Sequence, residues 1–370
     1  MRACIVLGTR PEIVKMSPII RSCQDDSLDF YVIHTGQHYS YDMDRVFFED
    51  LDLPTPEYHL DVGSGTHASQ TGRIMEGVER TLLRDPPSFV LVQGDTNTVL
   101  GATLAAAKLN VPVGHVEAGL RSFDRSMPEE KNRVVADHLS TYLFAPTEGA
   151  RRNLNQEGVV DGVHVTGNTI VDAVEQNMVL ARVRSTILED IGLDRGKYII
   201  ATAHREENVD DPQRLANIIS GLHMVMDETG LPVVYPMHPR TVRRVEEMGM
   251  DTGDILVIPP VGYLDFLHCL ANAKAVLTDS GGVQEEACIL GVPCITMREN
   301  TERPETVEVG ANCLVGTDPE AMTRAVMHSR ARDWQNPFGD GRAAERILCI
   351  LCPLGADDAS AKASTRDTGW

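Results

Sequence analysis

The sequence contains little lysine and little tryptophan, and its apolar runs are short. Only six of its 34 basic residues are lysines, and the 54 acidic residues give a formal net charge of −20. Such a surface argues against a nucleic-acid partner, which would need a basic patch. No apolar run reaches the roughly 18 residues that span a bilayer, and no signal-peptide cleavage pattern follows Met1. We therefore expect a cytoplasmic protein with no nucleic-acid partner and no membrane segment.

The cysteines indicate neither a disulfide framework nor a metal site. Of the eight cysteines, Cys4, Cys269 and Cys288 lie inside apolar runs, which is typical of small core residues in a reducing compartment. Cys349 and Cys352 form a CxxC without a second pair and without a flanking histidine. Core packing is therefore favoured over a metal or redox role, and we expect no metal ligands.

A regular alternation of apolar strands and amphipathic helices runs through most of the 370 residues. This alternation predicts an α/β protein with parallel sheets, and the length favours two domains of about 150–200 residues each. We expect a first domain over residues 1–170, a second over 171–340, a C-terminal helix over 341–353 and a disordered tail over 354–370. Polar residues at the strand ends of both domains predict a cleft between them that holds the chemistry.

The stretch from Ala275 to Gly291 carries the clearest ligand signal. Its apolar start predicts a buried strand, and Asp279-Ser280-Gly281-Gly282 predicts a tight turn before a helix. Glycines let a ligand approach the backbone, and the first helical N–H groups have no partner within the helix, so the turn suits a phosphate. Glu286 lies more than one turn into the helix and would meet another part of a nucleotide, such as a ribose hydroxyl. An ordinary capped turn is the alternative interpretation.

Charged residues follow several predicted strands of the first domain. Arg10 and Lys15 come after the first strand, and Asp95 and Glu117 come after two later strands. The carboxyl ends of parallel strands line the ligand crevice of an open α/β sheet, so these side chains are candidates for one site. For Arg10 and Lys15, a solvated turn with two surface charges is the competing explanation.

A helix is predicted to begin at Pro128. Glu129, Asn132, Arg133 and Asp137 then fall on one face of it, because they are spaced at i, i+3, i+4 and i+8. A stripe of surface ion pairs is the alternative explanation of this face.

Eight separated motifs together resemble those of the non-hydrolysing UDP-N-acetylglucosamine 2-epimerases. In the family's order they are GTRPE at 8–12, QGDTNT at 93–98, HVEAGLRS at 115–122, PEEKNR at 128–133, TGN at 166–168, TAHREEN at 202–208, TDSGGVQEEA at 278–287 and TERPE at 301–305, and GDGRAAERI at 339–347 matches near the end. The resemblance covers the chain except its tail. It implies a GT-B-like fold with two Rossmann-like domains facing across a cleft, a C-terminal helix that packs back on the first domain, and a homodimer.

The resemblance also implies a reaction. The family interconverts UDP-GlcNAc and UDP-ManNAc at C2, by anti elimination of UDP to 2-acetamidoglucal and re-addition of UDP, as a source of precursors for surface polysaccharides or other glycans. The implied substrate is a UDP-sugar, and the chemistry needs no cofactor and no metal.

Individual roles follow from the matched motifs. Asp95, Glu117 and Glu129 match the family's catalytic carboxylates, and His204 matches the histidine associated with the leaving group. The positions that match substrate-binding or UDP-binding residues are Arg10, Lys15, Arg133, His238, Ser280, Gly281, Gly282, Glu286 and Arg303. Among these, residues 280–282 would hold the diphosphate and Glu286 the ribose. Which carboxylate is the base and which is the acid stays open.

One region departs from the bacterial members of the family. Where those members carry a glutamine and two arginines at the site that binds an activating second UDP-GlcNAc, this chain has Ser40, Thr66 and Glu206. We therefore expect allosteric activation to be weakened, absent or differently built, with Gln37 and His38 as the remnant of that site. The HREEN form of the histidine motif is similar to archaeal members.

The sequence leaves two alternative functions open. Within the family, the substrate could be a related UDP-sugar such as a 2,3-diacetamido uronic acid. From a different class, a GT-B glycosyltransferase would share the nucleotide turn but would not need Asp95, Glu117 and Glu129 around C2.

Overall fold

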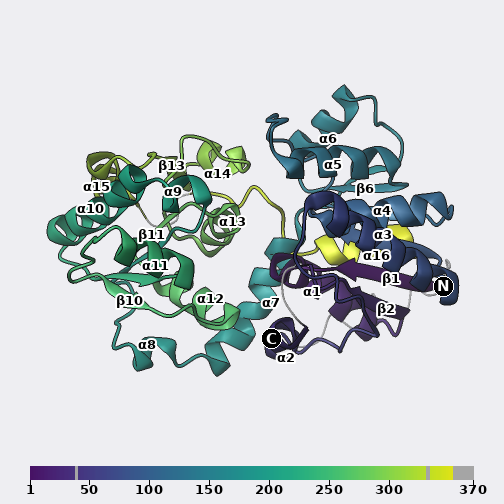
Figure 1. The fold of residues 1–370 in the computed structure, drawn as a ribbon, viewed down its shortest axis with the longest axis horizontal. Coiled ribbons are helices and arrows are strands. Elements are labelled where there is room, and N and C mark those ends of the chain that lie inside the picture. The colour runs from purple at the N-terminus through teal and green to yellow at the C-terminus, as the bar shows by residue number, and fades with distance from the viewer. Residues whose placement is uncertain (38–40, 331–333, 353–370) are drawn as a thin grey trace, which may run out of the picture. The chain divides into compact units, whose positions relative to one another are not determined.

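The computed structural model describes residues 1–37, 41–330 and 334–352, and of residues 41–44 the backbone alone. These residues form two compact units (Figure 1). Unit 1 consists of Met1–Ala173 together with the described residues from Gly339 onwards, and unit 2 consists of Val174–Phe338. The predicted tail at 354–370 lies outside the described residues, as do His38 and Ser40.

Unit 1 is built on a seven-stranded parallel sheet with the order β3-β2-β1-β4-β5-β6-β7. Its strands are β1 Arg2–Leu7, β2 Asp29–His34, β3 Tyr58–His59, β4 Phe89–Gln93, β5 Val113–Val116, β6 Tyr142–Ala145 and β7 Val163–Val165. Its helices are α1 Arg10–Asp25, α2 Tyr41–Asp50, α3 His67–Arg84, α4 Asn97–Lys108, α5 Pro128–Leu139, α6 Glu148–Gln156, the first turn of α7 Thr169–Arg184, and α16 Ala343–Leu351. The strand order reverses between β1 and β4, and this switch point is where open α/β sheets bind ligands.

Unit 2 repeats the same topology with six parallel strands in the order β10-β9-β8-β11-β12-β13. They are β8 Ile199–Thr202, β9 Val233–Pro236, β10 Leu256–Ile258, β11 Ala275–Thr278, β12 Cys294–Thr296 and β13 Asn312–Leu314. The helices, besides the rest of α7, are α8 Ile187–Asp190, α9 Glu206–Val209, α10 Pro212–Thr229, α11 Pro239–Glu247, α12 Tyr263–Asn272, α13 Gly281–Leu290, α14 Pro304–Glu308 and α15 Pro319–His328. Here the order reverses between β8 and β11, so the loops after these two strands flank the switch point.

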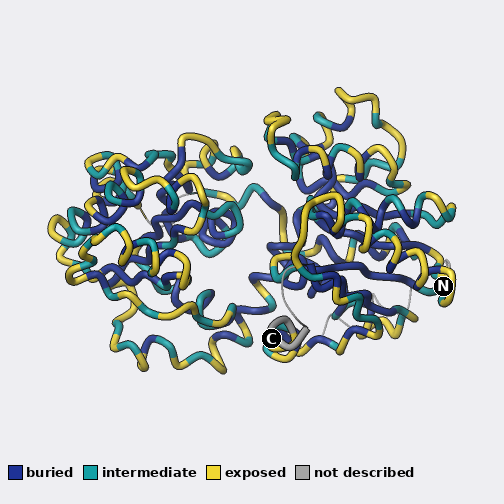
Figure 2. The backbone as a smooth tube through the Cα atoms, in the orientation of Figure 1, coloured by how far each residue is buried: buried dark blue, intermediate teal, exposed yellow. Residues whose placement is uncertain are grey.

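Each sheet is covered by helices on both faces, and its central strands, such as β1, β4, β8 and β11, are therefore buried along nearly their whole length. In β8, Ile199 and Ala201 pack into the core on one face of the sheet, whereas Ile200 packs into the core on the other. Figure 2 shows the inner strands of both units as buried and the outer surfaces of the helices as exposed. This two-sided burial confirms the parallel α/β architecture expected from the apolar runs.

The last helix within the described residues belongs to unit 1. Helix α16 packs against α1 (Figure 1), and Ile347 and Leu348 on its inner face are buried. The carboxylate of Asp172 accepts hydrogen bonds from the first backbone N–H groups of α16, at 3.2 Å from Ala343 and 3.0 Å from Ala344. A carboxylate at this end also complements the helix dipole. The chain thus returns to the unit in which it began.

The polar composition of residues 181–197 predicts a segment that crosses to the second domain without regular structure. The structure shows instead that α7 continues to Arg184 and that the short helix α8 places Leu188 in the core of unit 2. The burial of Leu188 determines this local structure, and the mostly polar composition of the segment gives no sign of it.

Because α16 is packed into unit 1, Ile347→Ala is expected to destabilise that unit. Ile347 is fully buried, and removing such a side chain costs about 2–5 kcal/mol. Amide hydrogen exchange should therefore quicken in peptides from residues 1–173 while peptides from 174–338 keep their rates. Cys349 is exposed and Cys352 half-buried, so the core-packing prediction for this pair was wrong. Cys349 offers a control on the same helix, since Cys349→Ala should change neither set. Unchanged exchange in unit 1 of the Ile347 variant would contradict this packing role.

Candidate active site

Two carboxylates leave the same edge of the unit 1 sheet, as the sequence predicted. Strands β4 and β5 pair in parallel, with Gln93 opposite Val116, so Asp95 and Glu117 follow neighbouring strand ends. On the other side of the switch point, β1 pairs with β4 and leads into the loop at Gly8 and Thr9. Side chains from three loops therefore meet at this edge.

Glu117 is buried and held by donors from three other elements. Its Oε1 lies 2.6 Å from Lys15 Nζ on α1 and accepts a hydrogen bond of 2.9 Å from Asn168 Nδ2. Its Oε2 accepts a hydrogen bond from Gln93 Nε2 at the end of β4. Glu117 has φ +68°, a left-handed conformation that is strained for a side chain of this size. Its carboxylate thus has a fixed position, and the Lys15 ammonium is part of what fixes it.

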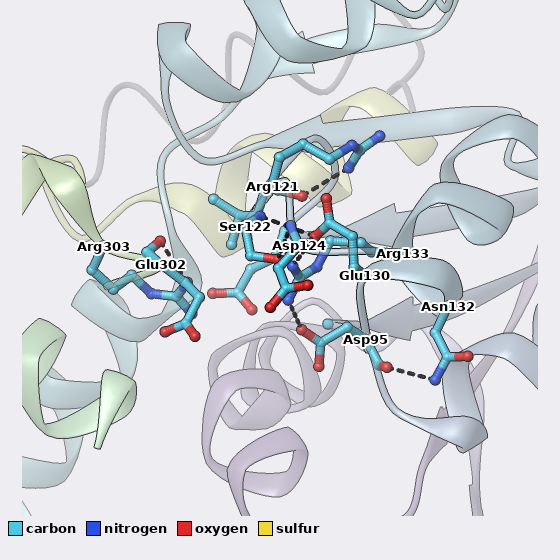
Figure 3. Close-up of polar contacts among 12 residues, drawn as sticks. Asp95, Arg121, Ser122, Asp124, Glu130, Asn132, Arg133, Glu302 and Arg303 are labelled. Atoms are coloured by element: carbon cyan, nitrogen blue, oxygen red, sulfur yellow. Dashed lines mark hydrogen bonds and ion pairs between the residues drawn. The ribbon is translucent and has the colours of Figure 1, made fainter. Parts of the chain in front are cut away.

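Asp95 is held by an arginine of helix α5. Arg133 Nη2 forms an ion pair with Asp95, while Arg133 Nη1 lies 2.5 Å from Glu130 Oε2 (Figure 3). Asn132 Nδ2 also donates to the main-chain oxygen of Asp95 at 2.9 Å. Burial opposes the charge of Arg133, but the two carboxylates outweigh burial and raise its pKa. Arg133 therefore carries a permanent charge beside Asp95.

Helix α5 does turn one face inward, but with a different glutamate than the spacing suggested. Asn132, Arg133 and Asp137 are buried as expected, and so is Glu130, whereas Glu129 is half-buried. The spacing rule grouped Glu129 with Asn132, Arg133 and Asp137 on one face, and Glu129 and Asn132 do line the same cavity, but the rule did not identify Glu130. The i, i+3 spacing of Glu130 and Arg133 was the available signal.

Glu130 fixes the loop that follows Glu117. Its carboxylate accepts hydrogen bonds of 2.9 Å from both the N–H and the hydroxyl of Ser122, and one of 3.1 Å from Phe123 N–H (Figure 3). Burial raises the pKa of a carboxyl group, but these donors and Arg133 more than offset burial, so the pKa of Glu130 is lowered. The charged Glu130 thus connects this loop to the arginine that holds Asp95.

A cavity of about 260 Å³ in unit 1 has Asp95 and Glu129 in its wall. Gln37, predicted to be a remnant of the allosteric site, also lines it, together with Ser64, Gly65, His67, Gln70, Thr96, Asn97, Pro128 and Asn132. Gln37 Oε1 accepts hydrogen bonds from Thr98, at 3.1 Å from its N–H and 2.9 Å from its hydroxyl. The volume lies just below the range of about 300–1,000 Å³ that is usual for small-molecule pockets, so the cavity suits part of a ligand, such as a sugar ring.

The loop that carries Arg10 is tied to the loop that carries Asp95. Glu12 Oε2 accepts hydrogen bonds from Gly8 N–H at 2.8 Å and Thr9 N–H at 2.7 Å, and its Oε1 accepts one of 2.6 Å from the Thr96 hydroxyl. Arg10, at the start of α1, lies with its guanidinium 4.9 Å from the centre of the Phe47 ring. Glu12, the glutamate of GTRPE, thus connects the two loops that flank the switch point, a role that the motif alone did not reveal.

In unit 2, one buried aspartate joins the two loops of the switch point. Asp279, which follows β11, is fully buried and accepts hydrogen bonds of 3.0 Å from His204 N–H and 3.1 Å from Arg205 N–H, both after β8. Its carboxylate also lies 3.1 Å from His204 Nδ1 and accepts a 3.1 Å bond from Asn208 Nδ2. Burial opposes ionisation, but the contacts with His204, Arg205 and Asn208 outweigh it and lower the pKa of Asp279. Asp279 therefore places His204, whose side chain is 57% exposed, beside the turn at 280–282.

The glycine turn has the predicted form. Strand β11 ends at Thr278, Ser280 is the N-cap residue, and α13 begins at Gly281. A methyl group added at Gly281 or Gly282 would make only ordinary contacts, 3.7 Å to Glu302 and 3.9 Å to Ser280. Packing within the chain therefore does not demand glycine here, and close approach by a ligand remains a sufficient reason for it.

The other predicted residues of unit 2 lie as follows. Glu286 is buried on α13, and the neighbouring Glu285 forms an ion pair of 2.6 Å with Arg303. His238 caps α11, its Nδ1 accepting a hydrogen bond of 3.2 Å from Arg240 N–H. Glu206, at a position expected to be arginine in bacterial members, lies 3.2 Å from Arg240 Nη1. In unit 1, Thr66 is the N-cap residue of α3.

Among the residues with described side chains, no group of three or more histidine, cysteine, aspartate and glutamate side chains is arranged to hold a metal ion. The helices in the described ranges likewise include none that is long and apolar enough to cross a membrane.

The family model described as UDP-N-acetylglucosamine 2-epimerase matches residues 21–352, and the chain therefore belongs to the UDP-N-acetylglucosamine 2-epimerase family. Among its relatives, the UDP-N-acetylglucosamine 2-epimerase of Methanocaldococcus jannaschii is 52% identical over 95% of this chain and 99% of its own length. The UDP-2,3-diacetamido-2,3-dideoxy-D-glucuronate 2-epimerase of Pseudomonas aeruginosa is 41% identical over 96% of this chain and 100% of its own.

Solved structures agree with this placement. The crystal structure of the Methanocaldococcus jannaschii UDP-GlcNAc 2-epimerase in complex with UDP-GlcNAc and UDP matches 95% of this chain and 99% of that chain, with a TM-score of 0.87 and 52% identity. UGT2 of Phytolacca americana, only 13% identical, covers 98% of this chain and 99% of that chain with a TM-score of 0.55 and shares the fold alone. The GT-B-like fold of two Rossmann-like units is thereby confirmed.

The buried carboxylate of Asp279 predicts a pH-dependent stability. Because the pKa of Asp279 is lowered in the folded state, its contribution is complete above the ordinary aspartate pKa and is lost as the pH falls through the folded-state value. At pH 7, Asp279→Asn should therefore lower the free energy of unfolding by about 1–3 kcal/mol, and the difference from wild type should shrink below about pH 4.

Urea unfolding at a series of pH values measures this difference. Asp318→Asn serves as the matched control, because Asp318 is an exposed N-cap of α15, where asparagine performs equally well. A pH-independent difference for the Asp279 variant would mean that Asp279 is not a stabilising charge.

Proposed function

We propose that this protein catalyses the reversible epimerisation of UDP-GlcNAc to UDP-ManNAc at C2, by anti elimination of UDP to 2-acetamidoglucal and re-addition of UDP. The observation that carries the proposal is the carboxylate set of unit 1. Asp95 and Glu117 follow adjacent strands, each paired with a cation, and Glu129 shares a cavity wall with Asp95. Membership of the family and 52% identity to a UDP-N-acetylglucosamine 2-epimerase supply the substrate.

The chemistry at C2 requires proton transfer on both faces of the sugar ring. A base removes the C2 proton, the C–H electrons form the C1–C2 double bond, and the C1–O bond breaks to release UDP. In the second half, UDP adds back to C1 while an acid delivers a proton to the opposite face of C2. Asp95, Glu117 and Glu129 supply these groups in our proposal, since carboxylates are suitable general acids and bases when held close to the reacting atom. Lys15 and Arg133 keep two of them in position.

The leaving UDP develops negative charge on its β-phosphate. In our proposal Ser280, Gly281 and Gly282 bind the diphosphate through the start of α13, where N–H groups lack helical partners. The Asp279-positioned His204 donates to the leaving oxygen, and stabilising that charge favours breakage of the C1–O bond. His238 and Arg303 complete the UDP-binding set of unit 2, and Glu286 binds the ribose. Arg10 of unit 1 belongs to the set that binds the rest of the substrate.

Three further expectations concern the assembly of the protein, its location and the use of its product. We propose a homodimer and a cytoplasmic location, and a product that serves as a precursor for surface polysaccharide or other glycans. A related UDP-sugar is the second candidate substrate, because the Pseudomonas aeruginosa relative named for a diacetamido glucuronate is 41% identical.

Incubation with UDP-GlcNAc in deuterated water tests the reaction. We expect UDP-ManNAc to form with one deuterium at C2, because the abstracted proton exchanges with solvent before re-addition. Glu129→Gln should lower the rate at least about 100-fold, in line with the usual contribution of a general acid or base. Glu148→Gln is the control, since Glu148 lies on the exposed side of α6.

The other outcomes separate the alternatives. Free ManNAc with UDP would indicate a hydrolase, and turnover of the diacetamido uronic acid sugar alone would indicate the related epimerase. No exchange at C2 without a sugar acceptor would indicate a glycosyltransferase and would end the epimerase proposal.

A separate prediction concerns activation by a second molecule of UDP-GlcNAc. Glu206 pairs with Arg240 and Thr66 caps α3, so neither position supplies the arginine that an anionic activator would need. We expect UDP-ManNAc alone to be converted at full rate without a lag. Initial rates measured with and without a trace of UDP-GlcNAc decide this, and a strict requirement for UDP-GlcNAc would show that activation survives.

A further inference from the structure

A charged cluster with no solvent access lies beneath the two carboxylate loops of unit 1. His115 on β5 and Asp137 on α5 have side chains that are 0% exposed, and Arg121 in the loop after β5 is 1% exposed. Arg121 also binds Glu157 through two hydrogen bonds, of 2.8 and 2.6 Å. The three groups without solvent access carry a net charge of +1 when His115 is protonated, and Glu157, whose side chain is 30% exposed, brings the sum to zero.

The hydrogen bonds of His115 determine its protonation. Its Nδ1 lies 2.7 Å from Asp137 Oδ1 and its Nε2 lies 2.8 Å from the carbonyl oxygen of Gly94. A carbonyl oxygen can only accept, so Nε2 carries a hydrogen. Asp137 is kept ionised by Arg121 at 2.7 Å and by Gly119 N–H at 3.1 Å, so Nδ1 carries a hydrogen as well. The ring is therefore an imidazolium.

The groups that face His115 agree with this assignment. Burial alone would lower its pKa and Arg121 repels its charge, but the charge and hydrogen bond of Asp137, with the Gly94 carbonyl, outweigh both and raise the pKa of His115. Burial would raise the pKa of Asp137, but the charges and hydrogen bonds of His115 and Arg121 outweigh burial and lower it.

The cluster touches both catalytic loops through main-chain atoms. His115 holds the carbonyl of Gly94, whose peptide unit contains the nitrogen of Asp95, and Asp137 holds the N–H of Gly119, two residues after Glu117. Gly119 has φ +81°, and a Cβ there would lie 2.3 Å from Ala150 O. The loop at Gly119 is thus closely packed, and its hydrogen bond to the carboxylate of Asp137 stabilises this conformation.

We propose that His115, as a permanently protonated imidazolium bound to Asp137, is a positioning residue that holds the loops of Asp95 and Glu117 at the spacing needed for proton transfer at C2. It does not touch the sugar. The role rests on the proposed epimerase activity, but the protonation of His115 does not.

Enzyme kinetics separates positioning from mere stabilisation. For purified, folded His115→Gln we expect kcat to fall about 10- to 100-fold, since a displacement of about 1 Å can cost 10²-fold in rate. The Kd for UDP should change less than about threefold, because the proposed UDP groups lie in unit 2. His164→Gln is the matched control: His164 is on β7 of the same sheet and outside the cluster, and the variant should keep the wild-type kcat. A folded His115→Gln enzyme with wild-type kcat overturns the proposal.

A second variant links activity to the charge. In Asp137→Asn the imidazolium loses its counter-ion, so His115 should deprotonate within the working range and kcat should fall as the pH rises from 6 to 9, more steeply than in wild type. An Asp137→Asn profile parallel to that of wild type contradicts the proposal.

Nitrogen NMR of the wild-type protein with labelled histidine supplies a test that needs no variant. We expect both ring nitrogens of His115 to carry a hydrogen at pH 8, above the range in which an ordinary histidine titrates, and a ring that is neutral at pH 8 overturns the proposal even if the variants fail to fold. If the wild-type protein forms no UDP-ManNAc, the epimerase assignment fails and the positioning role fails with it, while the NMR result still reports the charge of the cluster.

Discussion

At both switch points, a buried carboxylate accepts hydrogen bonds from another part of the chain, and the positions of the surrounding loops depend on these bonds. A buried charge is costly unless it is paired or hydrogen-bonded, so each such carboxylate fixes the elements that supply its donors. Glu117 fixes Lys15 on α1, and Asp279 fixes the segment of His204 after β8. The loops at the carboxyl ends of the strands are therefore positioned by charge as well as by packing.

This constraint has a consequence for how an acidic protein binds an anionic ligand. The net charge of −20 repels a diphosphate at long range. Local features have to compensate, namely helix N-termini and a few arginines. Arg133 and Arg303 each already lie against a carboxylate of their own unit, so their charges are oriented before any ligand arrives.

The strands and the glycine turn could be predicted from the sequence because they depend on local patterns. Apolar runs marked the strands, and the turn at Ser280 to Gly282 showed the signal of a strand, glycines and a helix start. Helices α4 and α11 were not predicted, although the alanine-rich sequence of α4 favours a helix.

The partners of the charged side chains could not be predicted in the same way. Sequence spacing grouped Glu129 with Arg133 on one face of α5, yet Glu130 is the residue that binds Arg133 and the loop at Ser122. Asp279 read as one residue of a turn, and its five contacts come from residues some 70 positions away in the chain. Such roles depend on which loops the sheet topology brings together, and a linear pattern does not contain that information.

The central claim is a division of labour: unit 2 binds UDP and the carboxylates of unit 1 act on C2. Calorimetric titration of UDP into two variants, alongside C2 exchange in deuterated water, tests it directly. Asp95→Asn should keep the wild-type Kd for UDP within about threefold while losing exchange, whereas Glu286→Gln should weaken UDP binding about 10- to 100-fold, through the loss of a charge-assisted hydrogen bond. A Glu286 variant that retains UDP affinity, or an Asp95 variant that loses it, would contradict the claim.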